Sequence, residues 1–526
     1  MNSGEPMYSH KECGIKSIND KIRQGIIHWQ SDYPIVSKKS RNGDGEKGIA
    51  VMRRGARDTS AGHRAGQEMS TKLAPQTLRA GENLGYRFTT LAYLVTEDFL
   101  KRCFGELKRD KASGIDGVSV EEYEVNLEER IKNLTARLKA KKYKPQPVRR
   151  VYIPKSDGSK RGLGIPAVED KVVQMGIKKI LEPIFEVDFM DVSFGFRPNR
   201  SCHDALELLN KTVMTKAVNY VVDMDIEKFF DNIDHEWLMK CLKQRIKDPS
   251  LLRLIGRFLK AGVMEEGKLF QTEKGTPQGG VLSPLLANIY LHYILDLWFE
   301  KRVKKQLKGF VQLVRYADDF IVCFQYGNEA KAFVERLKQR LSKFGLKIAE
   351  SKSRLIEFGR FVWQKARREN RKVAAFDFLG FAHFCGKTKK GKFKLGRKTA
   401  RTRFRRKMTE MNEWLKSVRN LVELKEWWKV LRMKLFGHYR YYGISGNFQA
   451  LNKFYFQTTK LAYKWVNRRS QKKSYNLEQY FRVLKHNPLP KPKIYHSAYY
   501  ALSSFKGCVA EEPCVGNLQA RFCEGC

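Results

Sequence analysis

Apolar and polar residues alternate over several short stretches in the middle of the chain, which is the pattern of half-buried β-strands. In one stretch, Val222, Met224 and Ile226 occupy every second position and form the apolar face of a predicted strand. The intervening acids, Asp223 and Asp225, therefore share its other face. A strand with acids on one face can be solvated, but the aromatic residues that flank this one favour packing under helices with the acids in a cleft.

Two further β-type runs, residues 311–315 and 320–324, flank the run Tyr316-Ala317-Asp318-Asp319. This pattern predicts a hairpin with two adjacent carboxylates at its tip. Adjacent aspartates repel one another, and a divalent cation neutralises that repulsion. Hard carboxylate oxygens favour Mg²⁺, the ion of phosphoryl transfer.

Helical periodicity appears on both sides of these strands. It predicts a helix over residues 97–107 and another that begins with a capping box at Ser119, with a glutamate three residues later. A third helical pattern covers residues 236–246, and we interpret Asp231 and Asp234 as its caps.

A glycine-rich turn, residues 274–284, leads into an apolar helix predicted over residues 285–297. Glycine turns before helices are common, so this signal is weak by itself. The glycines nevertheless let the backbone approach a nucleotide or template closely, and Gln278 can hydrogen-bond to it.

The charge of the chain indicates a polyanionic partner. Lys and Arg number 101 against 56 Asp and Glu, a net charge of +45 over 526 residues. Residues 386–408 alone hold twelve basic residues and no acid. Nucleic acid is the expected partner. An anionic membrane surface is the alternative, but no run of 18 apolar residues, signal peptide or lipidation motif is found, and we expect no membrane association and a bacterial cytoplasmic location.

The texture of the sequence predicts four zones: a basic, weakly structured extension (1–85), a globular part (86–385), a basic and then helical part (386–500), and a tail (501–526). The aromatic residues of the third zone have helical spacing, so we interpret most as packing residues and keep a stacking role open for exposed ones. The ten dispersed cysteines are expected to be reduced thiols. Cys523 and Cys526 have ligand spacing, but without a His-Asn-His pattern we favour incidental thiols over zinc.

The order of the motifs is more informative than any one of them. A strand with Asp225, a glycine-rich turn into a helix, and an Asp-Asp hairpin 93 residues after the first acid resemble motifs A, B and C of the polymerase palm. Five residues after Asp225 stands Phe230, where reverse transcriptases carry a bulky gate against the ribose 2′-hydroxyl. This resemblance implies a DNA product.

Over roughly residues 90–500 the chain resembles group II intron-encoded reverse transcriptases, or maturases. The resemblance is carried by runs that look like the fingers hairpin, a second block, the lysine motif, the primer grip and the maturase thumb: residues 150–155 and 160–166, 193–205, 345–352, 378–381, and 437–443 with 464–470. It implies an α+β right-hand polymerase with fingers and an antiparallel palm sheet (86–385), followed by an α-helical thumb, maturase domain X (386–500).

Carried over by position, the resemblance implies that Asp225, Asp318 and Asp319 are catalytic and bind two Mg²⁺ ions, with Ile226 adding a backbone carbonyl. Asp223 matches a position that the family often fills with an acid but does not use as a principal ligand.

The implied nucleotide contacts are Lys155 and Arg161 to the triphosphate, Phe230 and Gln278 to the nucleotide, and Lys352 near the pyrophosphate. For Lys155 and Lys352, a plain surface lysine is the alternative interpretation. The chain departs from the family at Gly162, where proline usually follows the arginine, and we expect a looser fingers turn there.

The implied function is an RNA-directed DNA polymerase that binds intron RNA, assists its splicing and copies it into DNA during retrohoming, with dNTPs and a DNA target or primer as further partners. No endonuclease segment follows the thumb, so we expect the primer to come from elsewhere, such as a replication fork. The alternatives are a domesticated reverse transcriptase, for defence or within a CRISPR system, and a splicing-only RNA-binding maturase.

Overall fold

A four-stranded antiparallel sheet lies at the middle of the fold. The computed structural model describes residues 80, 81, 83, 85–154, 158, 160–469 and 475–497. We call the sheet with strand order β6-β7-β3-β8 the central sheet. Its strands are β3 (Tyr220–Met224), β6 (Val311–Tyr316), β7 (Asp319–Phe324) and β8 (Arg354–Glu357).

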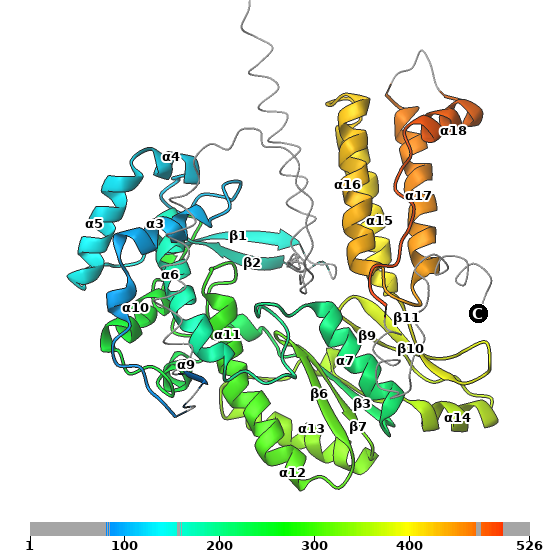
Figure 1. The fold of residues 1–526 in the computed structure, drawn as a ribbon, viewed down its shortest axis with the longest axis horizontal. Coiled ribbons are helices and arrows are strands. Elements are labelled where there is room, and N and C mark those ends of the chain that lie inside the picture. The colour runs from blue at the N-terminus through cyan, green and yellow to red at the C-terminus, as the bar shows by residue number, and fades with distance from the viewer. Residues whose placement is uncertain are drawn as a thin grey trace, which may run out of the picture.

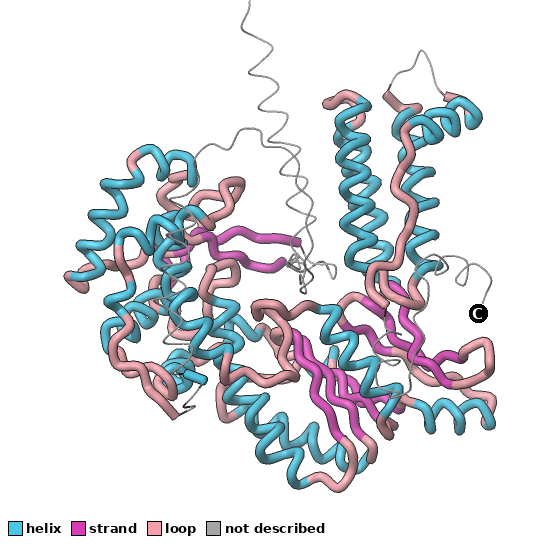
Figure 2. The backbone as a smooth tube through the Cα atoms, in the orientation of Figure 1, coloured by secondary structure: helices cyan, strands magenta, loops and turns pink. Residues whose placement is uncertain are grey.

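Two smaller sheets flank it (Figure 2). The N-terminal sheet has the order β2-β1-β4-β5 and consists of β1 (Val148–Pro154), β2 (Lys160–Ile165), β4 (Val263–Glu265) and β5 (Lys268–Phe270). The C-terminal sheet has the order β11-β10-β9 and consists of β9 (Phe376–Phe378), β10 (Phe381–Lys387) and β11 (Phe393–Thr399).

Helices surround the sheets in three groups (Figure 1). The N-terminal group comprises η1 (Ala92–Leu94), α3 (Glu97–Gly105), α4 (Val120–Val125), α5 (Leu127–Lys139), α6 (Val168–Glu186), α8 (Phe229–Asn232), α9 (His235–Leu242), α10 (Pro249–Leu259) and α11 (Ser283–Leu291). Near the central sheet lie α7 (Cys202–Thr215), η2 (His292–Asp296), η3 (Phe299–Val303), α12 (Lys304–Gln306), α13 (Gly327–Ser342) and η4 (Glu350–Lys352). Helix α14 (Arg360–Arg368) lies beside β11 of the C-terminal sheet. The C-terminal group comprises α15 (Arg401–Val418), α16 (Leu424–Tyr442), α17 (Phe448–Val466) and α18 (Leu477–His486).

Two hydrophobic cores meet at the central sheet. The predicted apolar face of β3, with Val222, Met224 and Ile226, belongs to the first core, together with apolar residues of α6, α9, α11 and α13. Val221 belongs to the second core, which α7, the C-terminal sheet and α15–α17 also form. Because side chains alternate along a strand, Asp223 points to the side of the second core. The sheet is therefore covered on both faces.

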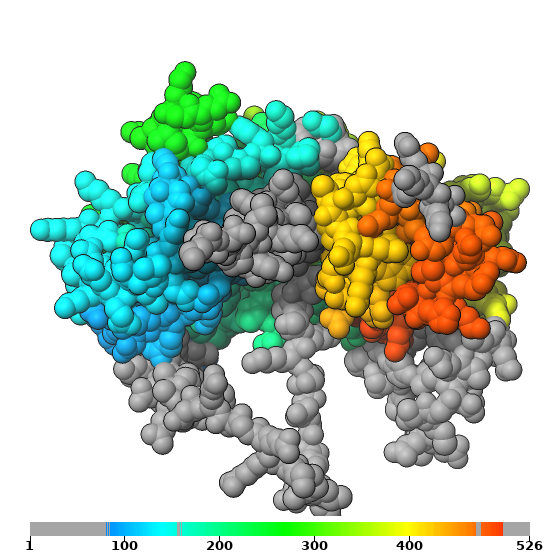
Figure 3. Space-filling model, turned by 90° about the horizontal axis from the view of Figure 1, so that it is seen from above, coloured from blue at the N-terminus to red at the C-terminus, as the bar shows by residue number. Residues whose placement is uncertain are grey.

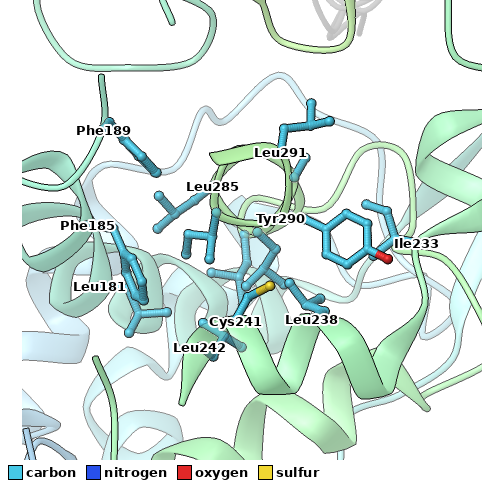
Figure 4. Packing of buried hydrophobic residues seen from close by; sticks show 14 of the residues in the cluster. Leu181, Phe185, Phe189, Ile233, Leu238, Cys241, Leu242, Leu285, Tyr290 and Leu291 are labelled. Atoms are coloured by element: carbon cyan, nitrogen blue, oxygen red, sulfur yellow. The ribbon is translucent and has the colours of Figure 1, made fainter. Parts of the chain in front are cut away.

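Helix α11 lies inside the first core. Every residue from Leu285 to Leu291 is buried, as expected for a helix that is apolar all round. Figure 4 shows Leu285 and Tyr290 among side chains of α6 and α9. The helix predicted over 285–297 is confirmed, although residues 292–296 form π-helical turns (η2), and the helical geometry continues beyond residue 297 through η3.

The helix starts that were predicted from capping patterns are largely confirmed. Ser119 and Glu122 form both hydrogen bonds of a capping box at α4, and Asp234 caps α9 by accepting a hydrogen bond from Trp237 N at 3.0 Å. The interpretation of Asp231 as a cap is wrong, because Asp231 lies within the short helix α8.

The predicted boundary at residue 385/386 falls inside β10. The first half of the basic segment therefore forms the hairpin β10–β11, and the helices begin only at Arg401. In the helices, the packing interpretation is confirmed for the aromatic residues that are buried: Trp414, Trp427, Trp428, Tyr439, Tyr442 and Trp465. Figure 3 shows these helices, yellow to orange, across the molecule from the blue N-terminal helices.

Some predictions concern residues outside the described part of the chain. These are the weakly structured extension up to residue 79, Lys155, and the C-terminal cysteines. Among the helices that the structure describes, none has the length and hydropathy needed to cross a membrane.

Candidate active site

Asp223 and Asp225 lie at the end of β3. Within β3, Asp223 pairs with Ile321 of β7 and Met224 pairs with Phe320. Asp225 is the first residue beyond the strand. The two acids therefore stand next to the end of β7 that carries Asp319.

Asp318 and Asp319 lie at the tip of the hairpin β6–β7, as predicted. Tyr316 pairs with Asp319, so that only Ala317 and Asp318 connect the two strands. Ala317 has φ +58°, the left-handed conformation that tight hairpin connections require at this place. The turn thus directs two adjacent carboxylates to the same edge as Asp225.

The electrostatics show that the four acids share one environment. Burial raises the pKa of Asp319 well above its usual value, and the negative charges of Asp223, Asp318 and Asp225 raise this pKa further. Burial and the charge of Asp225 also raise the pKa of Asp318. Like charges held together in a half-buried place are a local excess of negative charge.

Basic side chains offset part of this excess. The Lys352 Nζ lies 3.3 Å from the Asp225 Oδ2, and the Arg354 Nη2 lies 3.1 Å from the Asp223 Oδ2. Both basic side chains are more than half exposed, at 61% and 52%. Each can therefore contact a second, negatively charged group from solvent.

The backbone carbonyl of Ile226 takes no part in the hydrogen bonds of the β-bridge that this residue forms with Ile348. In the antiparallel bridge between Ile226 and Ile348, the Ala349 N–H donates to the Asp225 carbonyl at 2.8 Å, and the Glu227 N–H donates to the Lys347 carbonyl at 2.9 Å. The carbonyl of Ile226 points to the other side of its strand, since successive carbonyls alternate in direction.

The chemistry of these donors fits a divalent cation. In the described part of the chain, no three His, Cys, Asp or Glu side chains are already gathered as metal ligands. The acids nevertheless supply hard oxygens, and the pKa values of Asp318 and Asp319 are raised by an excess of negative charge that a cation relieves. The set fits Mg²⁺ better than a softer metal.

The glycine-rich turn lies against Phe230. The Gly275 N–H donates to the Ile233 carbonyl at 2.7 Å, and the Thr276 N–H donates to the Phe230 carbonyl at 2.8 Å. Gly275 has φ +88°, and a Cβ there would lie 2.8 Å from the Asp231 carbonyl oxygen. Glycine is therefore required for the turn to approach the backbone of the predicted sugar gate.

The same turn reaches the N-terminal sheet. The Gln278 carbonyl accepts a hydrogen bond from the Gly164 N–H of β2 at 2.7 Å, and the Gln278 side chain is half-buried. A cavity of about 180 Å³ lies alongside, lined by Arg150, Asp231, Phe258, Gly262, Val263, Thr272, Lys274, Gly275, Thr276 and Pro277. The glycine-rich turn thus contacts the backbone of Phe230 at Thr276 and the backbone of β2 at Gln278.

Of the predicted triphosphate contacts, Arg161 is exposed in β2, and its positive charge partly opposes the rise in the pKa of Asp318 that burial causes. Lys155 lies outside the described residues. Gly162 lies within β2 and pairs with Tyr152, whereas the connection between β1 and β2 lies largely outside the described residues, so the expected looser turn stays a prediction.

Sequence reasoning missed the buried ion pair beneath the hairpin. Arg315 and Asp296 are both fully buried, with the Arg315 Nε 2.8 Å from the Asp296 Oδ1. An arginine in a mostly apolar strand was the available signal, since a buried guanidinium requires a partner.

Comparisons with known proteins agree with this geometry. The family described as reverse transcriptase (RNA-dependent DNA polymerase) matches residues 153–383, a range that contains all four acids. Residues 153–383 therefore form a reverse transcriptase domain, and its antiparallel sheet carries the four acids.

Three relatives indicate which reverse transcriptases this chain resembles. Group II intron-encoded protein LtrA of Lactococcus lactis subsp. cremoris is 42% identical over 225 residues, which cover 42% of this chain and 37% of LtrA. Protein YkfC of Escherichia coli (strain K12) is 35% identical over 43% of this chain and 66% of YkfC. The mitochondrial nuclear intron maturase 4 of Arabidopsis thaliana is 32% identical over 26% of this chain and 17% of that protein. The chain therefore has a reverse transcriptase domain that is similar to parts of a group II intron-encoded protein and of an intron maturase.

Proposed function

We propose that the protein is an RNA-directed DNA polymerase that copies group II intron RNA into DNA. The observation that carries this proposal is the convergence of Asp225, Asp318 and Asp319 at one edge of the central sheet, within a reverse transcriptase domain. In this proposal the N-terminal sheet and its helices are the fingers, the central sheet is the palm, and α15–α17 form the thumb of a maturase.

Asp225, Asp318, Asp319 and the Ile226 carbonyl would hold two Mg²⁺ ions. When bound, such a pair supplies activation of a primer 3′-hydroxyl and stabilisation of the leaving pyrophosphate. Arg161 attracts the triphosphate of the incoming dNTP, since a guanidinium matches phosphate geometry.

Two other residues act on the nucleotide. Phe230 occupies the space of a ribose 2′-hydroxyl and so selects deoxyribose. Lys352, whose Nζ is held 3.3 Å from the Asp225 Oδ2, donates a proton to the leaving pyrophosphate oxygen.

The basic surface of the C-terminal part binds the intron RNA, assists its folding for splicing and holds it for copying during retrohoming. Support comes from the charge of residues 386–408 and from the similarity to an intron-encoded protein and an intron maturase. A DNA primer or target completes the set of partners.

The test is primer extension by the full-length protein on an RNA template with a DNA primer, dNTPs and Mg²⁺. We expect extension by the wild type and a loss of more than about a hundredfold for Asp318→Ala, because even partners of metal ligands cost 10- to 100-fold. The exposed Asp110→Ala is the matched control and is expected to retain activity. Wild-type protein that promotes splicing without extending the primer would support the splicing-only alternative, and an active Asp318→Ala variant would overturn the metal assignment.

A further inference from the structure

Arg315 is a fully buried cation directly beneath the carboxylate turn. Its Nη1 lies 2.9 Å from the carbonyl of Ala317, the residue that holds the left-handed conformation of the turn. The same Nη1 lies 3.0 Å from the Asn288 Oδ1, and the Nε lies 2.8 Å from the Asp296 Oδ1. One guanidinium therefore joins the turn to two other residues.

These residues link the turn to the element that follows the glycine-rich turn. Asn288 lies in α11, and Asp296 ends the π-helical turn η2 that continues this helix. Both side chains are buried, at 1% and 0% exposure. A planar guanidinium with fixed donor directions sets both the distance and the angle between α11 and the hairpin.

A second segment holds the turn from another side. The Arg315 N–H donates to the Val192 carbonyl at 2.8 Å, and the Asn288 Nδ2 donates to the Gly195 carbonyl at 2.7 Å. A Cβ at Gly195 would lie only 2.4 Å from the Ala317 nitrogen. The backbone of Gly195 thus lies directly against the turn, and Asn288 fastens that segment to the helix.

We propose that Arg315, Asp296 and Asn288 form a positioning device, the hairpin clamp, that fixes the carboxylates of Asp318 and Asp319 for metal binding. This inference rests on the proposed polymerase function. Stability alone does not account for the clamp, because a buried ion pair adds little to stability over apolar residues of the same size. The Arg315 guanidinium contacts the β6–β7 turn at Ala317, and the geometry of this turn sets the positions of the Asp318 and Asp319 carboxylates.

Arg315→Lys tests the clamp, since lysine keeps the charge and loses the fork of donors. We expect kcat for primer extension to fall about 10- to 100-fold, because a displacement of about 1 Å costs up to a hundredfold. The KM values for dNTP and template–primer are expected to stay within about twofold. Without substrates, we expect Mn²⁺ binding, measured by electron paramagnetic resonance, to weaken about tenfold, and amide exchange of residues 313–321 to quicken.

The matched control is Arg245→Lys, because Arg245 is another buried arginine in an ion pair, 3.3 Å from Asp188, and its guanidinium also donates to the carbonyls of Ala80 and Asn83. It is expected to lower the melting temperature as much as Arg315→Lys and to leave kcat and Mn²⁺ binding unchanged. Asn288→Ala is the second variant, and it decides the question should Arg315→Lys fail to fold.

The inference is overturned if both clamp variants keep wild-type kcat and Mn²⁺ affinity, or lose them only as Arg245→Lys does. A wild-type protein that does not extend primers contradicts the proposed function instead. In that case, Mn²⁺ binding and amide exchange still decide whether the clamp positions the acids.

Discussion

At the scale of single residues, Phe230 occupies a decisive position. It is half-buried in α8, in edge contact with Phe229 at a centroid distance of 5.4 Å, and its carbonyl is held by the glycine-rich turn. We expect Phe230→Ala to open space for a ribose 2′-hydroxyl and to lower the discrimination of dNTP over rNTP about tenfold or more. Competitive incorporation measures this ratio, and Phe448→Ala, an exposed phenylalanine in α17, is the control. Unchanged discrimination in Phe230→Ala would show that this residue is not the gate.

Asp170 gives a prediction about pH. Burial raises the pKa of Asp170 to about 7, although hydrogen bonds from Tyr143 and the Gln146 N–H oppose the shift. Because this folded-state pKa lies above that of an unfolded aspartate, the contribution to stability is greatest at acid pH and is lost as the pH rises to about 7.

Asp170→Asn removes this titration. The free energy of unfolding of Asp170→Asn minus that of the wild type is expected to be larger at pH 7.5 than at pH 5 by roughly 2–3 kcal/mol. Urea unfolding at the two pH values measures the difference, with Asp110→Asn as an exposed control. A difference in unfolding free energy that does not change with pH would contradict the raised pKa.

At the scale of elements, the sequence correctly predicted those features that are determined by residues close together in the chain. The capping box at Ser119 and the alternation of β3 are local, and both are present. Asp231 was placed wrongly because Lys228, with φ +44°, starts a separate short helix before Asp234. A left-handed lysine leaves no signature in the pattern of polar and apolar residues.

The same distinction applies to the candidate site. The strand acids and the adjacent aspartates are visible as local patterns, and the resemblance to the polymerase motifs joins them to each other and to Phe230. Their contact partners are distant in the sequence. Arg354 pairs with Asp223 across 131 positions, and Arg315 reaches Asp296 and Asn288 only through the packing of α11. Such pairs depend on tertiary packing, which local propensity does not encode.

At the scale of the whole molecule, the central sheet belongs to both hydrophobic cores. Val222 packs in the core of α6, α9, α11 and α13, and Val221 packs in the core that includes α7 and α15–α17. The sheet is therefore enclosed by elements from both ends of the chain. In Figure 1 the N-terminal sheet lies to one side of the central sheet and the helices that follow Arg401 lie to the other. If the proposed function is right, these two parts would hold a template–primer from two sides.

The net charge of +45 predicts strongly salt-dependent binding to RNA. Binding to phosphates releases counterions, so we expect affinity to fall about a thousandfold between 50 and 200 mM salt. The turn between β10 and β11 exposes Lys389 and Lys390 within the basic segment. Their joint replacement by glutamine is expected to lower the slope of log affinity against log salt by about 2, because each lysine that neutralises a phosphate adds about 1 to that slope.

A control variant with the same change of charge shows whether the lysines of the β10–β11 turn contact the RNA directly or act only through the net charge of the protein. Lys304 and Lys305 are exposed in α12, near the end of the central sheet that lies away from α15–α18 in Figure 1. Replacing both with glutamine leaves the lysines of the β10–β11 turn in place, so we expect the slope to change by much less than 2. Equal slopes for the two double variants would mean that RNA senses only the net charge. The hairpin β10–β11 would then have no direct part in holding the RNA.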